Sequence, residues 1–127
     1  MSNDEIKGRL KQLKAEEFVW IVYIGIIILS FYSNSLERKY FITGDLNSKK
    51  KYQDLTVLIF VILVFVYIYF LKDSLDDLRK LSPSDSDKKK RLVFLSFLGS
   101  FLIAISGFIY LYIAIKDENI DVELAFN

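Results

Sequence analysis

The sequence predicts an all-α integral membrane protein, with three transmembrane helices in an antiparallel bundle and short amphipathic helical extensions on the cytoplasmic side. Three uncharged runs, residues 18–36, 55–71 and 92–115, are the basis of this prediction. A helix needs about 20 consecutive apolar residues to cross the hydrocarbon core of a bilayer. The apolar residues of the 127-residue chain are gathered in these blocks, and its mean hydropathy is +0.31. One membrane domain covering residues 1–127 follows.

The first helix is predicted to begin outside the membrane. Asp4 can cap it, and apolar residues at 4,3 spacing favour one helix over residues 4–35, with residues 4–17 as a cytoplasmic extension. The stripe is taken as the inward face and contains Ile6, Leu10, Leu13, Glu17, Trp20, Ile24, Ile27 and Phe31. Its first part is either a docking face for a partner helix or an extension that packs on its own neighbours. The leader balances four basic against four acidic residues, and no small-x-small cleavage site follows, so we expect a retained span.

The second helix is predicted to continue beyond its apolar run. Residues 34–54 form the expected connection, with turn residues at 43–47. A β-branched stripe at 4,3,4 spacing then continues in the same register outside the run; it consists of Val57, Val61, Val64 and Ile68, followed by Leu71, Leu75 and Leu78. This unbroken periodicity predicts one helix from about residue 47 to about residue 81, with residues 72–91 as the second cytoplasmic extension.

A short turn leads to the third helix. Ser82 is predicted as its N-cap, with Pro83 at the first helical position and Asp85 two residues later. The turn predicts an antiparallel hairpin of helices two and three. A basic run marks the entry into the membrane, as a topology determinant or as a lipid-headgroup site, and consists of Lys88, Lys89, Lys90 and Arg91.

Small residues lie along one face of the third span. We expect this face to be the helix-packing surface, because small side chains let two backbones approach closely in lipid. It comprises Ser96, Gly99, Ser100, Ala104 and Gly107, and its predicted counterpart is the stripe Val57, Val61, Val64 and Ile68. The Gly99/Ser100 region is expected to make the tightest contact, and the opposite, aromatic side is expected to face lipid.

Residue types argue against catalysis. Cysteine and histidine are absent, which removes thiolate nucleophiles, imidazole bases and the usual zinc and haem ligands. No phosphate loop, nucleophile elbow or zinc-helix motif occurs, and no span contains a charge. We therefore expect no enzyme, no cofactor and no metal. A net charge of +1 also argues against a nucleic-acid partner.

The flanking charges predict an orientation. The N-terminal tail and residues 72–91 together contain 11 basic residues, whereas residues 34–54 and the C-terminal tail contain 6. The side with more lysine and arginine is expected to be cytoplasmic. This gives a cytoplasmic N-terminus and an external C-terminus, in an integral protein of the cell (plasma) membrane.

Two functions from different classes agree with these features. The first is a small non-enzymatic polytopic protein that acts through helix–helix contacts, as a subunit, regulator or immunity-type protein of a membrane complex, with a membrane protein partner or a homo-oligomer. The alternative is a small oligomeric pore-former of the holin type, in which Ser96, Ser100 and Ser106 would line a polar lumen. Collapse of the membrane potential on expression distinguishes the pore from the interaction protein.

Overall fold

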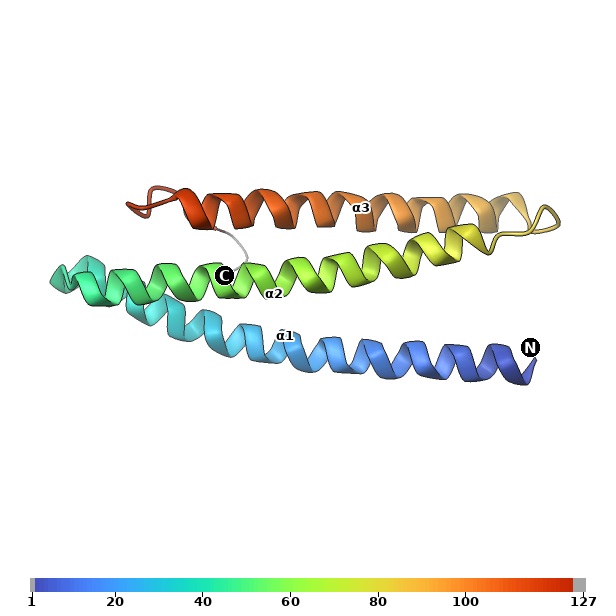
Figure 1. Cartoon of the computed structure of the whole chain (residues 1–127), viewed down its shortest axis with the longest axis horizontal. Helices are drawn as coiled ribbons and strands as arrows, with labels where there is room; N and C mark the ends of the chain where they lie inside the picture. Colours follow the sequence, from blue (N-terminus) through green and yellow to red (C-terminus); the bar gives the residue numbers. More distant parts are fainter. Residues whose placement is uncertain (1, 125–127) are drawn as a thin grey trace. The chain divides into compact units, whose positions relative to one another are not determined.

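Three long helices make up the fold of residues 2–124, the part of the chain that the computed structural model describes (Figure 1). They are α1 (Asn3–Thr43), α2 (Leu46–Arg79) and α3 (Asp87–Lys116). Each contains a segment long and apolar enough to cross a membrane. The predicted fold class, all-α with three apolar helices, is confirmed. The chain divides into two compact units that meet at Tyr52 and Gln53, so the first holds α1 and the start of α2, and the second holds the rest of α2 with α3.

Helix α1 is longer at both ends than its apolar run. At the N-terminus, the Ser2 hydroxyl accepts the N–H of Glu5 at 3.2 Å, and the Glu5 carboxylate accepts the N–H of Ser2 at 3.3 Å. This capping box satisfies two otherwise unpaired donors, which explains why Ser2, and not Asp4, caps the helix. The C-terminal end lies at Thr43, about two turns beyond the predicted end near residue 35. Residues 36–39 are good helix formers despite their charge, so the helix continues past the uncharged run.

Two residues connect α1 to α2, where the sequence had indicated a connection over residues 34–54. Gly44 ends α1 with a φ of 72°, a left-handed conformation that glycine adopts without steric cost. Asp45 then caps α2: its carboxylate accepts the Asn47 N–H at 3.2 Å and the Ser48 hydroxyl at 2.8 Å. Hydrogen bonding from Ser48, assisted by the Asn47 N–H and by Lys39, lowers the pKa of Asp45 below its usual value.

Helix α2 runs without a break from Leu46 to Arg79, so the predicted continuation beyond the apolar run is confirmed. Within the extension, the buried Ser74 donates its hydroxyl hydrogen bond to the Leu71 carbonyl at 2.9 Å. The extension therefore remains helical, and the hydroxyl group of its buried Ser74 has a hydrogen-bond partner within the same helix.

The predicted cap of α3 is wrong by one turn. Asp85 does accept the N–H of Ser82, at 2.8 Å, as a capping box would require, but no helix begins at this turn. Ser86 adopts an extended backbone and accepts the Lys89 N–H at 3.1 Å, so the helix begins at Asp87. Ser86 is thus the N-cap, and Asp87 in the first turn complements the helix dipole.

Candidate functional site

Helices α2 and α3 run antiparallel and form one packed seam in the second unit (Figure 1). The side of α3 that is buried or half-buried recurs at alternating spacings of four and three residues. This inner face consists of Val93, Phe97, Ser100, Ala104, Gly107, Leu111 and Ala114. Such a heptad repeat is the pattern of helices that pack nearly parallel to one another over their whole length.

Gly107 is a point of close approach in this seam. A Cβ added to Gly107 would lie 2.7 Å from Cδ2 and 3.2 Å from Cε2 of Tyr67, and 3.4 Å from Cγ2 of Val64. Only glycine leaves room for the tyrosine ring here. One turn further along the same seam, the rings of Phe60 and Tyr110 lie 5.8 Å apart between centroids. The seam therefore combines a small residue of α3 against an aromatic residue of α2, at Gly107, with an aromatic pair, Phe60 and Tyr110.

Gln53 ties the start of α2 in this unit to the end of α3. Its side-chain N–H group donates to the carbonyl oxygens of Asp117 at 3.1 Å and Glu118 at 2.7 Å. These carbonyls follow the last helical turn, where backbone acceptors have no intrahelical partner. The Asp117 carboxylate in turn accepts the N–H groups of Asp121 and Val122, at 2.8 and 2.9 Å, which holds the tail close to the helix end.

The structure brings together only part of the predicted packing face of α3. Ala104 and Gly107 are buried and Ser100 is half-buried, whereas Ser96 and Gly99 are exposed. A Cβ on Gly99 would meet no other residue within 4 Å. The prediction that the Gly99/Ser100 region makes the tightest contact is therefore corrected, because the inner face is centred on the heptad of Ser100, Ala104 and Gly107, and Gly99 lies about 100° from Ser100.

The predicted counterpart on α2 also differs. Val64 is buried and lies against Gly107. Val57 and Val61 are half-buried, and Ile68 is 42% exposed. Phe60 and Tyr67, which the β-branched stripe did not include, also contact α3. In the sequence, the small residues Ser100, Ala104, Gly107 and Ala114 share one heptad register. This pattern could have located the correct face.

The α1 stripe, predicted as the inward face, consists of exposed side chains. Outside the apolar run, Ile6, Leu10 and Leu13 are 42%, 59% and 46% exposed. Inside the run, Trp20, Ile24, Ile27 and Phe31 are all more than half exposed. The buried residues of α1 include Val19, Ile26 and Ser33, which recur every seven residues. Residues separated by seven share a face, and this one lies on the opposite side of the helix from the stripe.

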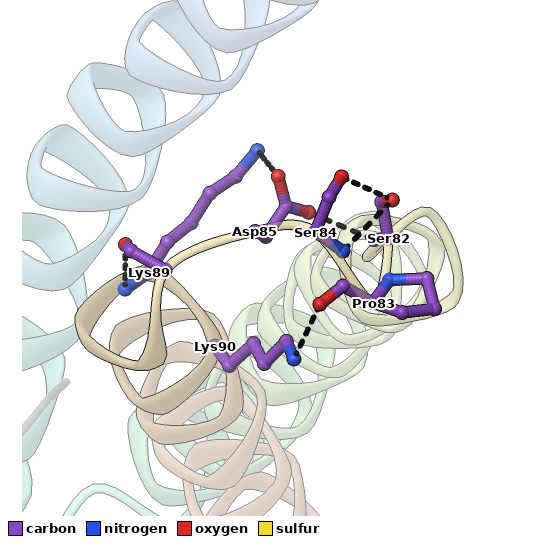
Figure 2. A network of polar contacts seen from close by, with 7 residues as sticks. Ser82, Pro83, Ser84, Asp85, Lys89 and Lys90 are labelled. Atoms are coloured by element: carbon purple, nitrogen blue, oxygen red, sulfur yellow. Dashed lines mark hydrogen bonds and ion pairs between the residues drawn. The ribbon is translucent and has the colours of Figure 1, made fainter.

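Two of the four predicted lipid-headgroup residues are engaged by the turn before α3 (Figure 2). Lys89 forms an ion pair with Asp85 at 3.2 Å, and Lys90 donates to the Pro83 carbonyl at 3.2 Å. Lys88 and Arg91 have no side-chain partner among residues 2–124 and remain available for lipid phosphates, so that role stays a prediction. The Ser82 N–H, together with Lys89, lowers the pKa of Asp85 below its usual value.

The part of the chain that the structure describes holds no group of three potential metal-ligating side chains. The polar contacts found at the turns cap helices and join turns, which gives them a local structural role. No family of known proteins, no curated protein and no solved structure matches this chain. Its function is therefore argued from the geometry of its helices.

Proposed function

We propose that this chain is a non-enzymatic multi-pass protein of the cell membrane that acts through helix–helix contacts, as a subunit, regulator or immunity-type protein of a membrane complex. The observation that supports this proposal is the exposed stripe of α1, which continues from its apolar run into the charged N-terminal segment. Lipid can cover Trp20, Ile24 and Ile27, but Ile6, Leu10 and Leu13 lie before the uncharged run begins at Phe18.

Apolar side chains exposed to water favour an interface. Full burial of a leucine or isoleucine side chain is worth about 1.5–3 kcal/mol, so covering three half-exposed ones is a substantial driving force. Scattered single leucines on a surface need no explanation. Three on one face of one helix, in register with a lipid-facing stripe, are best explained by a helix that lies beside α1.

The pore-forming alternative finds less support. Ser100 is half-buried on the inner face of α3, whereas Ser96 and Ser106 are exposed. Ser100 and Ser106 are also about 120° apart around the helix, so the three serines do not form one polar strip. A lumen lined by all three would require the seam of α2 and α3 to open.

Purification from native membranes in mild detergent tests the proposal. We expect native mass spectrometry to find a complex of fixed stoichiometry, heavier than the 14.9 kDa chain. The triple variant Ile6→Ser/Leu10→Ser/Leu13→Ser is expected to lower its yield, because it removes the apolar face without changing charge. Leu46→Ser, at a residue 70% exposed outside the apolar runs, is the control and is expected to have little effect.

Two results would contradict the proposal. One is that the chain is purified from its native membranes only as a monomer. The other is loss of membrane potential on inducible expression, which would identify a pore.

A further inference from the structure

We infer that the α1 stripe binds a helical extension of a different membrane protein, with acidic side chains flanking its outer part and a basic or hydrogen-bond-donating residue at the membrane edge. This inference rests on the proposed function and specifies the partner's chemistry. The binding surface is the set Ile6, Leu10, Leu13 and Glu17, together with the charges on both sides of it.

The register of the stripe favours a helix as the occupant. Spacings of 4, 3 and 4 residues join its first four members, and the same alternation continues through the membrane run to Phe31. A heptad repeat is the pattern that keeps one helix against another over several turns. Lipid chains do not require such a register, and exposure of apolar side chains to water is unfavourable. A helix is therefore the occupant that fits this surface. Since α1 is one helix from Asn3 to Thr43, an occupant of the full stripe runs alongside it across the membrane edge.

The charges beside the stripe define what the occupant must carry. In a heptad with the stripe at the core positions, Glu16 lies at the membrane edge, on the same flank as Arg9. The three basic flanking residues are Lys7 and Lys14 on one side and Arg9 on the other. None of the three has an ion-pair partner among residues 2–124. Flanking charges in paired helices select partners of opposite sign. The complement of the outer part, residues 6–14, is therefore acidic, whereas Glu16 and Glu17 at the membrane edge favour a cation or a hydrogen-bond donor on the partner.

A second copy of the chain fits this surface poorly. Parallel copies in register would bring Arg9 of one copy near Lys14 of the other. They would also bring Glu17 opposite Glu17 at the membrane edge, where like charges repel and are costly to desolvate. A partner with a cation at that height would instead neutralise Glu17.

A lipid surface also fits poorly. Leu13 and Ile6 lie five and twelve residues before the uncharged run. At 1.5 Å per residue, the unbroken helix carries Leu13 and Ile6 about 8 and 18 Å from the first residue of the uncharged run. The headgroup region beside the hydrocarbon core is only about 5–8 Å thick, so Ile6 lies beyond it.

A defined probe tests the inference with the full chain in vesicles. The probe is a synthetic single-span peptide whose extension carries leucine at 4,3 spacing and glutamate on both flanks; the comparison peptide carries lysine on the flanks. The chain has no cysteine, so Ser2→Cys gives a single fluorophore site for energy transfer to the labelled peptide. We expect the acidic probe to associate about tenfold more strongly than the basic one, a ratio within the range of complementary surface charges.

Charge variants localise the effect. Lys7→Glu/Lys14→Glu is expected to remove or reverse the preference for the acidic probe. Lys50→Glu/Lys51→Glu changes the net charge equally at exposed sites at the start of α2 and is expected to retain it. Equal association of the two probes, or equal effects of the two double variants, would overturn the inference.

Other occupants give distinct results. Cross-linking of Leu10→Cys between copies without the probe would identify a second copy and overturn the inference. A blue shift of a fluorophore at Leu13→Cys in probe-free anionic vesicles would identify a lipid surface and also overturn it. A native complex that survives Lys7→Glu/Lys14→Glu unchanged would overturn this inference but leave the proposed function intact.

Discussion

The contact of Gly107 with Tyr67 depends on the absence of a single methyl group. Gly107→Ala would place a Cβ 2.7 Å from the ring carbon Cδ2, so the ring or the helix must move. Overpacking of this kind costs about 1–3 kcal/mol. Gly99→Ala is the matched control, because a Cβ there meets no other residue within 4 Å. We expect unfolding in mixed micelles, followed by circular dichroism, to show a clear loss for Gly107→Ala and no loss for Gly99→Ala; the reverse order would contradict the packing of α3.

Asp85 makes the turn before α3 sensitive to acid. Its carboxylate accepts the Ser82 N–H and pairs with Lys89, and these contacts lower its pKa. A carboxylate with a lowered folded-state pKa stabilises the fold above its unfolded value, about 3.9, and loses that contribution as the pH falls through the folded value. We therefore expect Asp85→Asn to be less stable than the wild type at pH 6, with the difference shrinking as the pH falls through the lowered folded-state pKa of Asp85.

Titration of unfolding with pH measures this effect. Asp76→Asn is the control, since the Asp76 side chain has no hydrogen bond or ion pair among residues 2–124. A stability difference between wild type and Asp85→Asn that is the same at pH 6 and pH 3 would show that the carboxylate's charge has no role in the turn.

At the scale of one element, α2 joins a membrane-spanning segment to a charged extension in a single helical register. Leu71, Leu75 and Leu78 are half-buried. One alanine inserted after Lys72 rotates Leu75 and Leu78 by about 100° relative to the preceding turns. We expect the insertion to lower the melting temperature measurably. Lys72→Ala, at an exposed residue of the same site and with no shift of register, is the control. An unchanged melting temperature for the α2 insertion would mean that these leucines contribute no packing.

The elements were predicted from the sequence more fully than their contacts. Hydropathy located all three helices, and periodicity located the continuation of α2. The end of α1 was missed because an uncharged run defines the part of a helix that lipid can cover, whereas the backbone continues through Glu37, Arg38 and Lys39 until Gly44 stops it. The inner face of α3 was partly missed for a different reason. A helical wheel fixes directions around one axis, but the direction that meets α2 depends on how the Tyr67 ring fits against Gly107.

At the scale of the whole chain, the three candidate spans and the two short turns restrict the possible topologies. Consecutive spans of one chain cross a bilayer in alternating directions. If all three segments span, we expect the N-terminus and the Ser82–Asp85 turn on one side, and the α1–α2 turn and the C-terminal tail on the other. The basic residues, 11 against 6, predict which side is cytoplasmic.

Cysteine accessibility in intact cells can test this orientation without background, because the chain has no cysteine of its own. Val122→Cys in the tail and Leu46→Cys beside the first turn are expected to react with a membrane-impermeant maleimide before lysis. Ser2→Cys and Ser84→Cys are expected to react only after lysis, because the excess of lysine and arginine holds their side in the cytoplasm. All four positions lie outside the uncharged runs and are exposed, so burial does not limit labelling. Labelling of Ser2→Cys and Ser84→Cys in intact cells, with protection of the other two, would invert the topology and place Ile6, Leu10 and Leu13 outside the cell.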